Sequence, residues 1–414
     1  MTVAEAVDGL PRRVASWAAA MSLAPNSLTG ISLALGVCSA VWFTAGSTLG
    51  YAAGALALSG SYLAGRPARQ LAGRPGGGTR GWQPGAKAVS DRRLARACAA
   101  LTECGAYASL AAAGPAAGAL AASGLVTGGQ VTSGPAAGWS GIWQLATTTV
   151  IMVAVSQLAV ACASPALAGR PPEASPGGLT WRLLALPYGG RILLVAVTAP
   201  VLGARGAFFA VLGGAVVAIG YAIVSGRSRP DAARMERTVA CRDDGLIATE
   251  IGRPVRGQLV PLPPALTGFA AVSVLALLGL RHLPGLLLLA PVVAMLLAAV
   301  GSSHPHDGRL DWIVPVLLQA AQFAYVAAIG AASGVPGPLI FAVCAMIAMH
   351  YADLAGHARR GAALGWEGRM IAAGAGAALG IATFAYLLLA AYLGVLICRE
   401  VMTNWLPATE GDRR

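Results

Sequence analysis

Histidines and carboxylates gather at two places in the second half of the chain. The stretch "SSHPHDGRLDW" contains His304, His306, Asp307 and Asp311, and "MHYADLAGH" contains His350, Asp353 and His357. Residues 350, 353 and 357 are spaced to share one helix face, and a zinc ion could use their side chains as ligands. The alternative is an interfacial role, in which His350 and Asp353 tie helix ends together. Neither stretch has the His-Glu-x-x-His or Cys-x-x-Cys spacing of strong metal motifs.

A single carboxylate, Glu103, falls inside an apolar stretch of the first half, with Arg96 at the start of that stretch. A charge in such a position is costly unless it is paired or faces a polar cavity. We therefore expect Glu103 either to line a polar pocket, with Asp91 and Arg96 nearby, or to pair with an arginine.

The elements that position these residues are membrane-spanning helices. Of the 414 residues, 56% are hydrophobic and only 11% are charged. Stretches of about 17 to 25 apolar residues, enough to cross a bilayer as a helix, recur along the chain. The sequence predicts an all-α, polytopic membrane protein with about eleven transmembrane helices. The expected spans are 28–46, 48–65, 97–118, 141–163, 190–204, 206–224, 262–280, 283–300, 310–332, 336–351 and 370–397.

Arginine placement predicts which way the chain is threaded. Basic clusters at 66–96, 170–191, 227–256, 309 and 359–369 all fall on one side of the membrane if the N-terminus is cytoplasmic. We therefore expect a multi-pass protein of the cell membrane with a cytoplasmic N-terminus. The net charge of +12 then reflects topology and attraction to anionic lipids, rather than nucleic-acid binding.

A long polar stretch, residues 225–257, divides the spans into six and five. We expect a membrane domain at 1–228, a cytoplasmic connector at 229–257 and a second membrane domain at 258–414.

Motifs around the first three spans carry a family resemblance. The entry "APNSLTG" precedes the first span, "YLAGRPARQLAGR" closes the second, and "LARACAALTECGAYASLAAAG" opens the third. This order resembles the CDP-alcohol phosphotransferases, which carry a Pro-Asn-x-x-Thr entry and the signature D-x2-D-G-x2-A-R-x8-G-x3-D-x3-D. Gly65, Ala68, Arg69 and Gly78 match the non-acidic signature positions. The stretch 181–227 and the second half resemble an actinobacterial branch of the family with an extra C-terminal membrane domain.

The resemblance implies transfer of a phosphatidyl or phosphoalcohol group from a CDP-linked donor to an alcohol, with Mg²⁺ or Mn²⁺ held by four aspartates. This chain lacks at least three of the four. Ser61 and Ala64 occupy the first two positions, and Ala95 and Ala99 the other two when the third span is aligned on "ECGAYASL". An ungapped alignment gives Trp82 and Ala86 instead, and a third keeps only Asp91. Each alignment loses at least three ligands, so no metal is expected at this site.

Two functions stay open at this point. One is transfer by another ligand set; the other is a catalytically inactive relative that binds a lipid, a nucleotide or a partner. The resemblance implies phosphate-binding roles for Gly65, Ala68, Arg69, Gly78 and Arg191, supported by the affinity of guanidinium groups for phosphate. Expected partners are membrane lipids and a CDP-linked lipid or alcohol, without nucleic acid, and a homodimer is left open. The stretch "CRDDGLIATE" mimics Asp-Gly-x-x-Ala, but Thr249 replaces the arginine, and we interpret this match as coincidental.

Overall fold

The protein is all-helical throughout the part that the computed structural model describes. The described residues are 25–71, 86–125, 141–163, 186–226, 241, 243–255, 260–278, 285–302, 308–354 and 364–405, and their regular elements are α-helices and short 3-10 helices. This confirms the predicted fold class.

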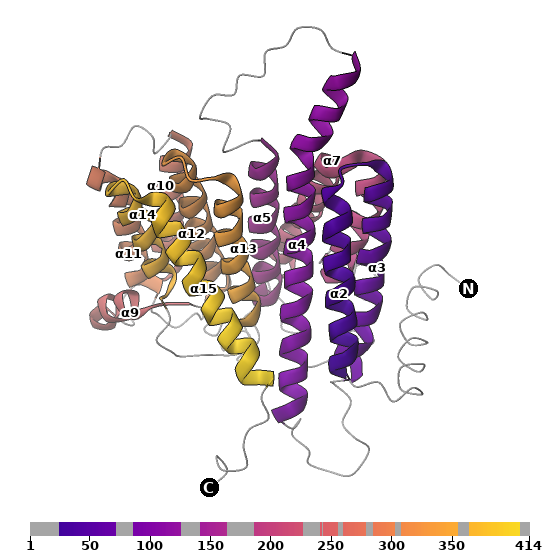
Figure 1. Ribbon diagram of the computed structural model, residues 1–414. Helices are drawn as coiled ribbons and strands as arrows, with labels where there is room; N and C mark the ends of the chain where they lie inside the picture. The colour runs from indigo at the N-terminus through magenta and orange to yellow at the C-terminus, as the bar shows by residue number, and fades with distance from the viewer. Residues whose placement is uncertain are drawn as a thin grey trace, which may run out of the picture. The chain divides into compact units, whose positions relative to one another are not determined.

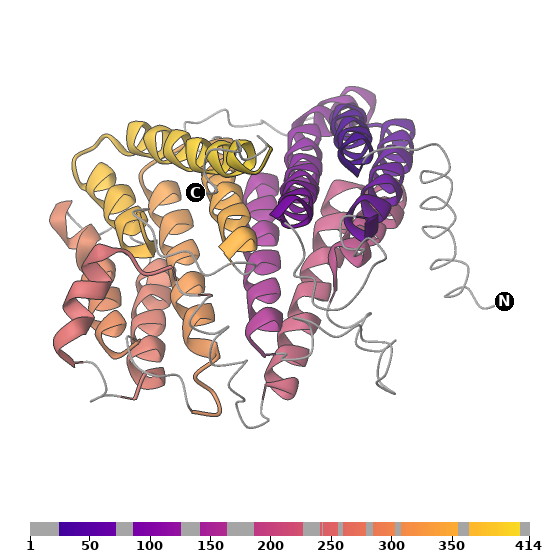
Figure 2. The same cartoon turned by 90° about the horizontal axis from the view of Figure 1, so that it is seen from below.

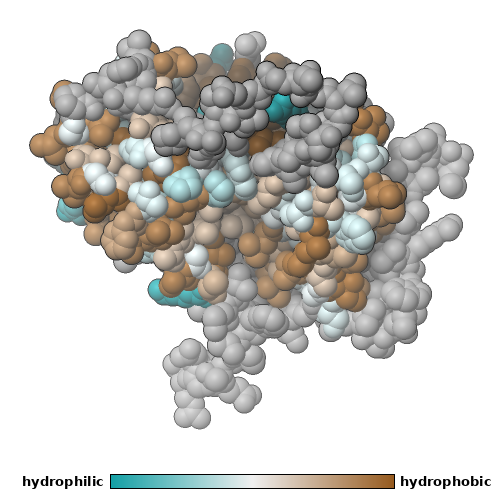
Figure 3. Space-filling view, turned by 45° about the horizontal axis from the view of Figure 1, so that its top comes forward, coloured by the Kyte–Doolittle hydropathy of each residue, from teal (hydrophilic) through white to brown (hydrophobic). Residues whose placement is uncertain are grey.

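Among the described residues, five helices are long and apolar enough to cross a membrane. They are α2 (Pro25–Thr44), α5 (Gly141–Ala163), α7 (Tyr188–Ser225), α12 (Ile313–Ala332) and α15 (Ala382–Trp405). Large apolar side chains on them are exposed, such as Phe384, Leu387 and Leu388 at helical spacing on α15. Apolar residues also cover much of the described surface in Figure 3. Such a surface matches lipid rather than water, as expected of a membrane protein, while the count of eleven spans stays a prediction.

The first of two compact units contains α2, α3 (Thr48–Leu71), α4 (Ala86–Leu125) and the beginning of α7. Helices α2, α3 and α4 pack against one another and run side by side in Figures 1 and 2. Small residues bring them close: a Cβ at Gly36 of α2 would lie 2.5 Å from the Thr102 hydroxyl oxygen of α4. Close approach at small residues is typical of helix packing in membranes.

Helix α7 is interrupted at Gly203, which has φ 69° and ψ −175°. A Cβ at Gly206 would lie 2.2 Å from the Cβ of Leu202, a far closer approach than residues four apart have in a regular helix. The chain therefore changes direction sharply at Gly203. The break lies within the predicted span 190–204, two residues before the predicted gap at 205. An unbroken helix of 38 residues would extend well beyond a hydrocarbon core of about 30 Å.

The second unit is built around α12. Helices α5, α10 (Leu262–Leu278), α13 (Gly337–Leu354) and α14 (Trp366–Ala378) pack against it. The 3-10 helix η6 (Gly285–Leu289), continuing into α11 (Ala290–Ser302), packs against α14. The short α9 (Leu246–Gly252), followed by the 3-10 helix η4 (Arg253–Val255), contacts α11 and α14. Gly380, with φ 73°, separates α14 from α15, so the predicted long span 370–397 is broken.

The two units do not follow the order of the chain. Helix α5, assigned to residues 1–228 in the sequence-based division, packs on α12 and α13. The part of α7 from Val211 onward also belongs to the second unit. Residues 1–228 therefore contribute helices to both units, and the boundary at 229–257 stays a prediction about the sequence.

Candidate functional site

The first aspartate position of the resembled signature is occupied by a serine that joins two helices. Ser61 of α3 is completely buried, and its hydroxyl donates to the Ser32 carbonyl of α2 at 2.7 Å. The Ser32 hydroxyl in turn donates to the Ser61 carbonyl at 2.8 Å, and the two hydroxyl oxygens lie 3.2 Å apart. This reciprocal pair gives Ser61 a helix-packing role.

In the alignment anchored on "ECGAYASL", the other three signature positions are alanines, whose side chains are methyl groups. Ala64 on α3 is half-buried, Ala95 on α4 is buried, and Ala99 on α4 is half-buried. A methyl group offers no oxygen to a divalent cation. Residues 95, 99 and 103 follow one another at intervals of four on the same face of α4. Glu103 therefore lies one turn beyond the last signature position.

Glu103 forms a buried ion pair with Arg191 of α7. Arg191 Nε donates to Glu103 Oε1 at 2.5 Å, and Nη2 donates to Oε2 at 2.8 Å. Tyr107 adds a third hydrogen bond to Oε1 at 2.8 Å. Glu103 is 5% exposed and Arg191 4% exposed. Of the two alternatives for Glu103, the structure shows pairing with an arginine, although Arg191 is 88 residues away in the chain.

The end of α3 carries three of the signature residues, and Tyr62 of the same helix contacts the start of α7. Gly65 is buried, and Ala68 and Arg69 fall in the final turns of α3, but their side chains are not among those described. Arg66 stacks over the ring of Tyr62, 6.0 Å from its centroid. Tyr62 also covers Gly189, where a Cβ would lie 2.3 Å from the tyrosine hydroxyl oxygen.

Three further predicted residues complete this region. Arg96 is exposed on α4, about two turns before the buried Glu103. Asp91 lies within α4, and nothing is described of its side chain, while Gly78 lies outside the described residues. The structure thus brings Glu103 and Arg191 together and leaves the expected grouping of Asp91, Arg96 and Glu103 untested.

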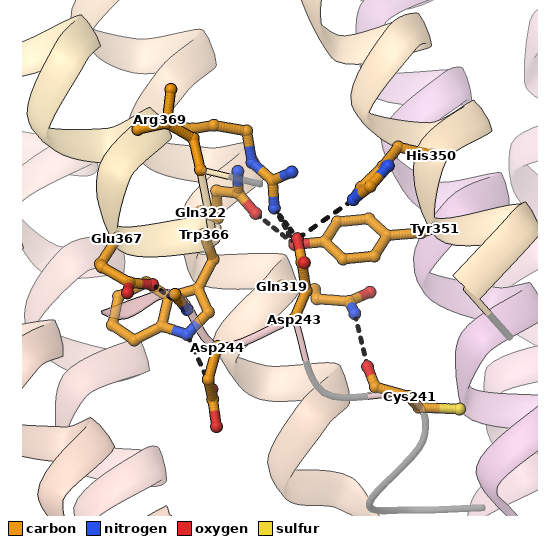
Figure 4. Close-up of polar contacts among 12 residues, drawn as sticks. Cys241, Asp243, Asp244, Gln319, Gln322, His350, Tyr351, Trp366, Glu367 and Arg369 are labelled. Carbon is orange, nitrogen blue, oxygen red and sulfur yellow. Dashed lines mark hydrogen bonds and ion pairs between the residues drawn. The ribbon is translucent and has the colours of Figure 1, made fainter. Parts of the chain in front are cut away.

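A second polar cluster lies within the second unit, where the segment 241–252 meets α12, α13 and α14 (Figure 4). Gln319 of α12 donates to the Cys241 carbonyl at 3.1 Å, and the Trp366 indole donates to Asp244 Oδ1 at 3.1 Å. The backbone N–H of Trp366 donates to the Asp243 carbonyl at 3.1 Å. Part of the segment that we interpreted as a coincidental match is therefore docked onto three helices.

Asp243 is the acidic centre of this cluster. Its Oδ2 accepts a hydrogen bond from Arg369 Nη2 and lies 3.5 Å from His350 Nε2. Burial raises the pKa of Asp243, but the charges and hydrogen bonds of Arg369 and His350 together outweigh burial and hold this pKa below its ordinary value. Asp243 is thus the anionic partner of a buried guanidinium.

Glu367 plays a different role, because its carboxylate caps α9. Its Oε2 accepts from the Gly245 N–H at 3.0 Å, and its Oε1 accepts from the Ala248 N–H at 3.2 Å. Burial raises the pKa of Glu367, and the two backbone donors partly offset this effect. A carboxylate from α14 therefore supplies the N-terminal cap that Gly245, with no side chain, cannot provide.

The cluster contains more buried donors than acceptors among the described residues. Tyr351 donates to Gln322 Oε1 at 2.5 Å and accepts from Arg369 Nη2 at 2.9 Å. Arg369 Nε and Nη1, Gln322 Nε2 and both ring nitrogens of His350 have no hydrogen-bond partner in the described part of the chain. A buried donor without a partner costs about 1–3 kcal/mol. Such a surplus in a native structure is a feature that needs an explanation.

The predicted zinc alternative involves residues that the structure describes only in part. His350 points toward Asp243, and Asp353 lies in the last turn of α13, where its side chain is not described. His304, His306, Asp307 and His357 lie outside the described residues. Within the described ranges, no three His, Cys, Asp or Glu side chains are grouped so that they could hold a metal ion.

Sequence reasoning missed this second cluster as a site. One available signal was the stretch "GWEGRM", where Glu367 and Arg369 stand directly before an apolar span. Charges beside or within membrane helices are costly and are usually paired. With 17 acidic residues in the chain, the adjacent Asp243 and Asp244 were candidates for such pairing.

Comparison with protein-family models finds a match to part of the chain. Residues 231–412 match the model of a family of unknown function, DUF5941. The matched range contains every residue of the second cluster. No curated protein and no solved structure matches the chain significantly.

Proposed function

We propose that this chain is a catalytically inactive relative of the CDP-alcohol phosphotransferases, a membrane protein that binds the phosphate of a lipid or nucleotide without transferring it. In this proposal the chain crosses the cell membrane eleven times, six times within residues 1–228 and five times within residues 258–414. The signature residues Gly65, Ala68, Arg69 and Gly78 and their neighbouring arginines provide the phosphate-binding surface.

The hydrogen-bonded pair of Ser32 and Ser61 carries this proposal. Catalysis in the resembled family depends on several anionic oxygens that hold divalent ions against a diphosphate. At the first of these positions, the Ser61 hydroxyl is neutral, buried and directed to the Ser32 carbonyl. The nearest described carboxylate on that face of α4, Glu103, is already neutralised by Arg191. Both contacts favour an inactive protein over transfer by another ligand set.

We expect the purified full-length protein to release no CMP above background from CDP-diacylglycerol. The assay uses a panel of alcohols with Mg²⁺ or Mn²⁺, and an active CDP-alcohol phosphotransferase as the positive control. Binding of CDP-diacylglycerol is measured in parallel and is expected to weaken strongly with salt, because exposed arginines are screened.

Restoring the four aspartates tests whether the site lacks metal binding only because its ligands are missing. Aspartates introduced at 61, 64, 95 and 99 are expected to create measurable Mn²⁺ binding, since they would restore the anionic oxygens. Metal-dependent turnover by the unmodified protein, abolished by a chelator, would overturn the proposal. The missing ligands would then be sought at Asp91, Glu103 and the histidine group.

The proposed orientation gives a separate prediction. The basic stretch 66–96 is expected to face the cytoplasm, because its positive charges oppose translocation. In a cysteine-free variant, a single cysteine at Ser90 should resist an impermeant thiol reagent in intact cells and react after the cells are opened. Labelling in intact cells would show that this stretch faces outward, and the proposed orientation of the whole chain would then have to be reversed.

A further inference from the structure

The polar cluster around Asp243 is built mainly from the helices on which the segment 241–252 docks. Arg369 comes from α14, Gln322 from α12, and His350 and Tyr351 from α13. Arg369 and Gln322 are completely buried, and His350 is 5% exposed. Figure 4 shows the side chains of these residues directed toward the Asp243 carboxylate and the Tyr351 hydroxyl. Three packed helices therefore present a cradle of donors to one acidic side chain.

The donors of this cradle exceed what one carboxylate can satisfy. The atoms without partners among the described residues carry three N–H bonds on Arg369, two on Gln322 and at least one on His350. The distance of 3.5 Å from His350 Nε2 to Asp243 is longer than an ordinary hydrogen bond. A carboxylate has two oxygens, whereas a phosphoryl group has three or four arranged tetrahedrally. The groups without partners are hydrogen-bond donors. Donors repel a metal cation and bind the oxygens of an oxyanion, so the site favours an oxyanion.

We propose that Arg369, His350 and Gln322 form a binding site for a phosphoryl group through the donors that Asp243 does not engage, and that the negative charge of Asp243 beside this site opposes anion binding there. The site belongs to the second unit and is independent of the phosphate-binding surface proposed for residues 1–228. The phosphoryl group is free phosphate or the phosphate monoester of a lipid. Guanidinium and imidazole donors recognise both through the same oxygens.

The other anchors of the segment make this effect of Asp243 testable. Cys241, Asp244 and Gly245 are held by Gln319, Trp366 and Glu367, respectively, and none of these contacts uses the Asp243 side chain. Asp243→Asn removes the opposing charge while the shape of the side chain and these anchors remain. The variant therefore changes the electrostatics of the cradle with little change in its geometry.

The experiment titrates inorganic phosphate into the full-length protein in a phosphate-free maltoside detergent and follows binding by calorimetry. The wild-type chain is expected to bind weakly. Asp243→Asn should bind phosphate about tenfold more tightly, because a negative charge beside the site weakens the affinity for an anion about tenfold or more. The double variant Asp243→Asn/Arg369→Gln, which also lacks the guanidinium, should lose binding. Asp244→Asn is the matched control, since Asp244 contacts Trp366, and it should bind as the wild type does.

A second arm distinguishes the two sources of the phosphoryl group. Dihexanoyl phosphatidic acid replaces inorganic phosphate, and tighter binding of the lipid identifies a headgroup site, whereas equal binding identifies a site for free phosphate. The proposal is overturned if Asp243→Asn binds phosphate no more tightly than the wild type, or if the double variant still binds. If Asp243→Asn does not fold, His350→Phe in the otherwise native chain must weaken phosphate binding, and unchanged binding would overturn the proposal.

Discussion

Replacing Arg191 with methionine is expected to lower the free energy of unfolding by about 3–5 kcal/mol. The substitution leaves the Glu103 carboxylate buried at 5% exposure, with only the Tyr107 hydroxyl among the contacts described above. Removing one partner of a buried pair costs far more than the pair itself contributes, because the remaining charge is desolvated without compensation. Unfolding by SDS in mixed micelles measures the difference.

A double-mutant cycle tests whether this loss comes from the stranded charge. Glu103→Leu combined with Arg191→Met removes both charges and should be less destabilising than Arg191→Met alone. Arg205→Met is the matched control, because Arg205 lies on the same helix but is exposed, and it should change stability by no more than about 0.5 kcal/mol. Equal effects of the two arginine substitutions would contradict a structural role for the pair.

Gly365→Ala is expected to detach the segment 243–252 from α14 and to cost about 1–3 kcal/mol. A Cβ at Gly365 would lie 2.1 Å from the Gly245 backbone nitrogen and 2.6 Å from its Cα. These are backbone atoms, which cannot rotate away as the end of a side chain can. The Gly365 φ of −63° is open to any residue, so the effect is steric rather than conformational.

Hydrogen exchange measures this detachment at the two amides that Glu367 caps. Those of Gly245 and Ala248 should exchange faster in Gly365→Ala, because their acceptor moves away. Gly213→Ala is the control, since a Cβ there meets nothing within 4 Å and alanine is favoured within a helix. Unchanged exchange at Gly245 and Ala248 would show that the segment does not depend on its close approach to Gly365.

The helices themselves could be predicted from the sequence, because each requires only a local run of apolar residues. A break in α7 was also predicted, as the gap at residue 205 between the spans 190–204 and 206–224, two residues from the observed break at Gly203. The division into units could not be predicted in this way. Whether α5 packs on α12 and α13 depends on surfaces far apart in the sequence.

The contacts of the candidate sites could be predicted only where the energetic cost of burying a charge required a partner. A carboxylate within an apolar span needs a partner, and this reasoning predicted an arginine for Glu103 as one alternative. This argument alone could not select Arg191 among the arginines, because 88 residues separate it from Glu103. Arg191 was expected in this region only through the family resemblance, as a phosphate-binding residue. The positions of Asp243 and Asp244 gave no such indication of a buried partner, because both lie in a polar stretch that is typical of a solvated connector. Their burial arises from docking against α14, with Asp243 126 residues from Arg369.

The capping of α9 by Glu367 has a consequence during synthesis of the chain. With seven residues, α9 is too short to be stable by itself in water. Glu367, whose Oε1 accepts the Ala248 N–H, is 119 residues further along the chain. At translation rates of about 5–20 residues per second, the ribosome needs roughly 6–24 s to add them. During that interval the first turn of α9 lacks this cap. Proteases and chaperones therefore meet this segment as an unfolded stretch until α14 has been made.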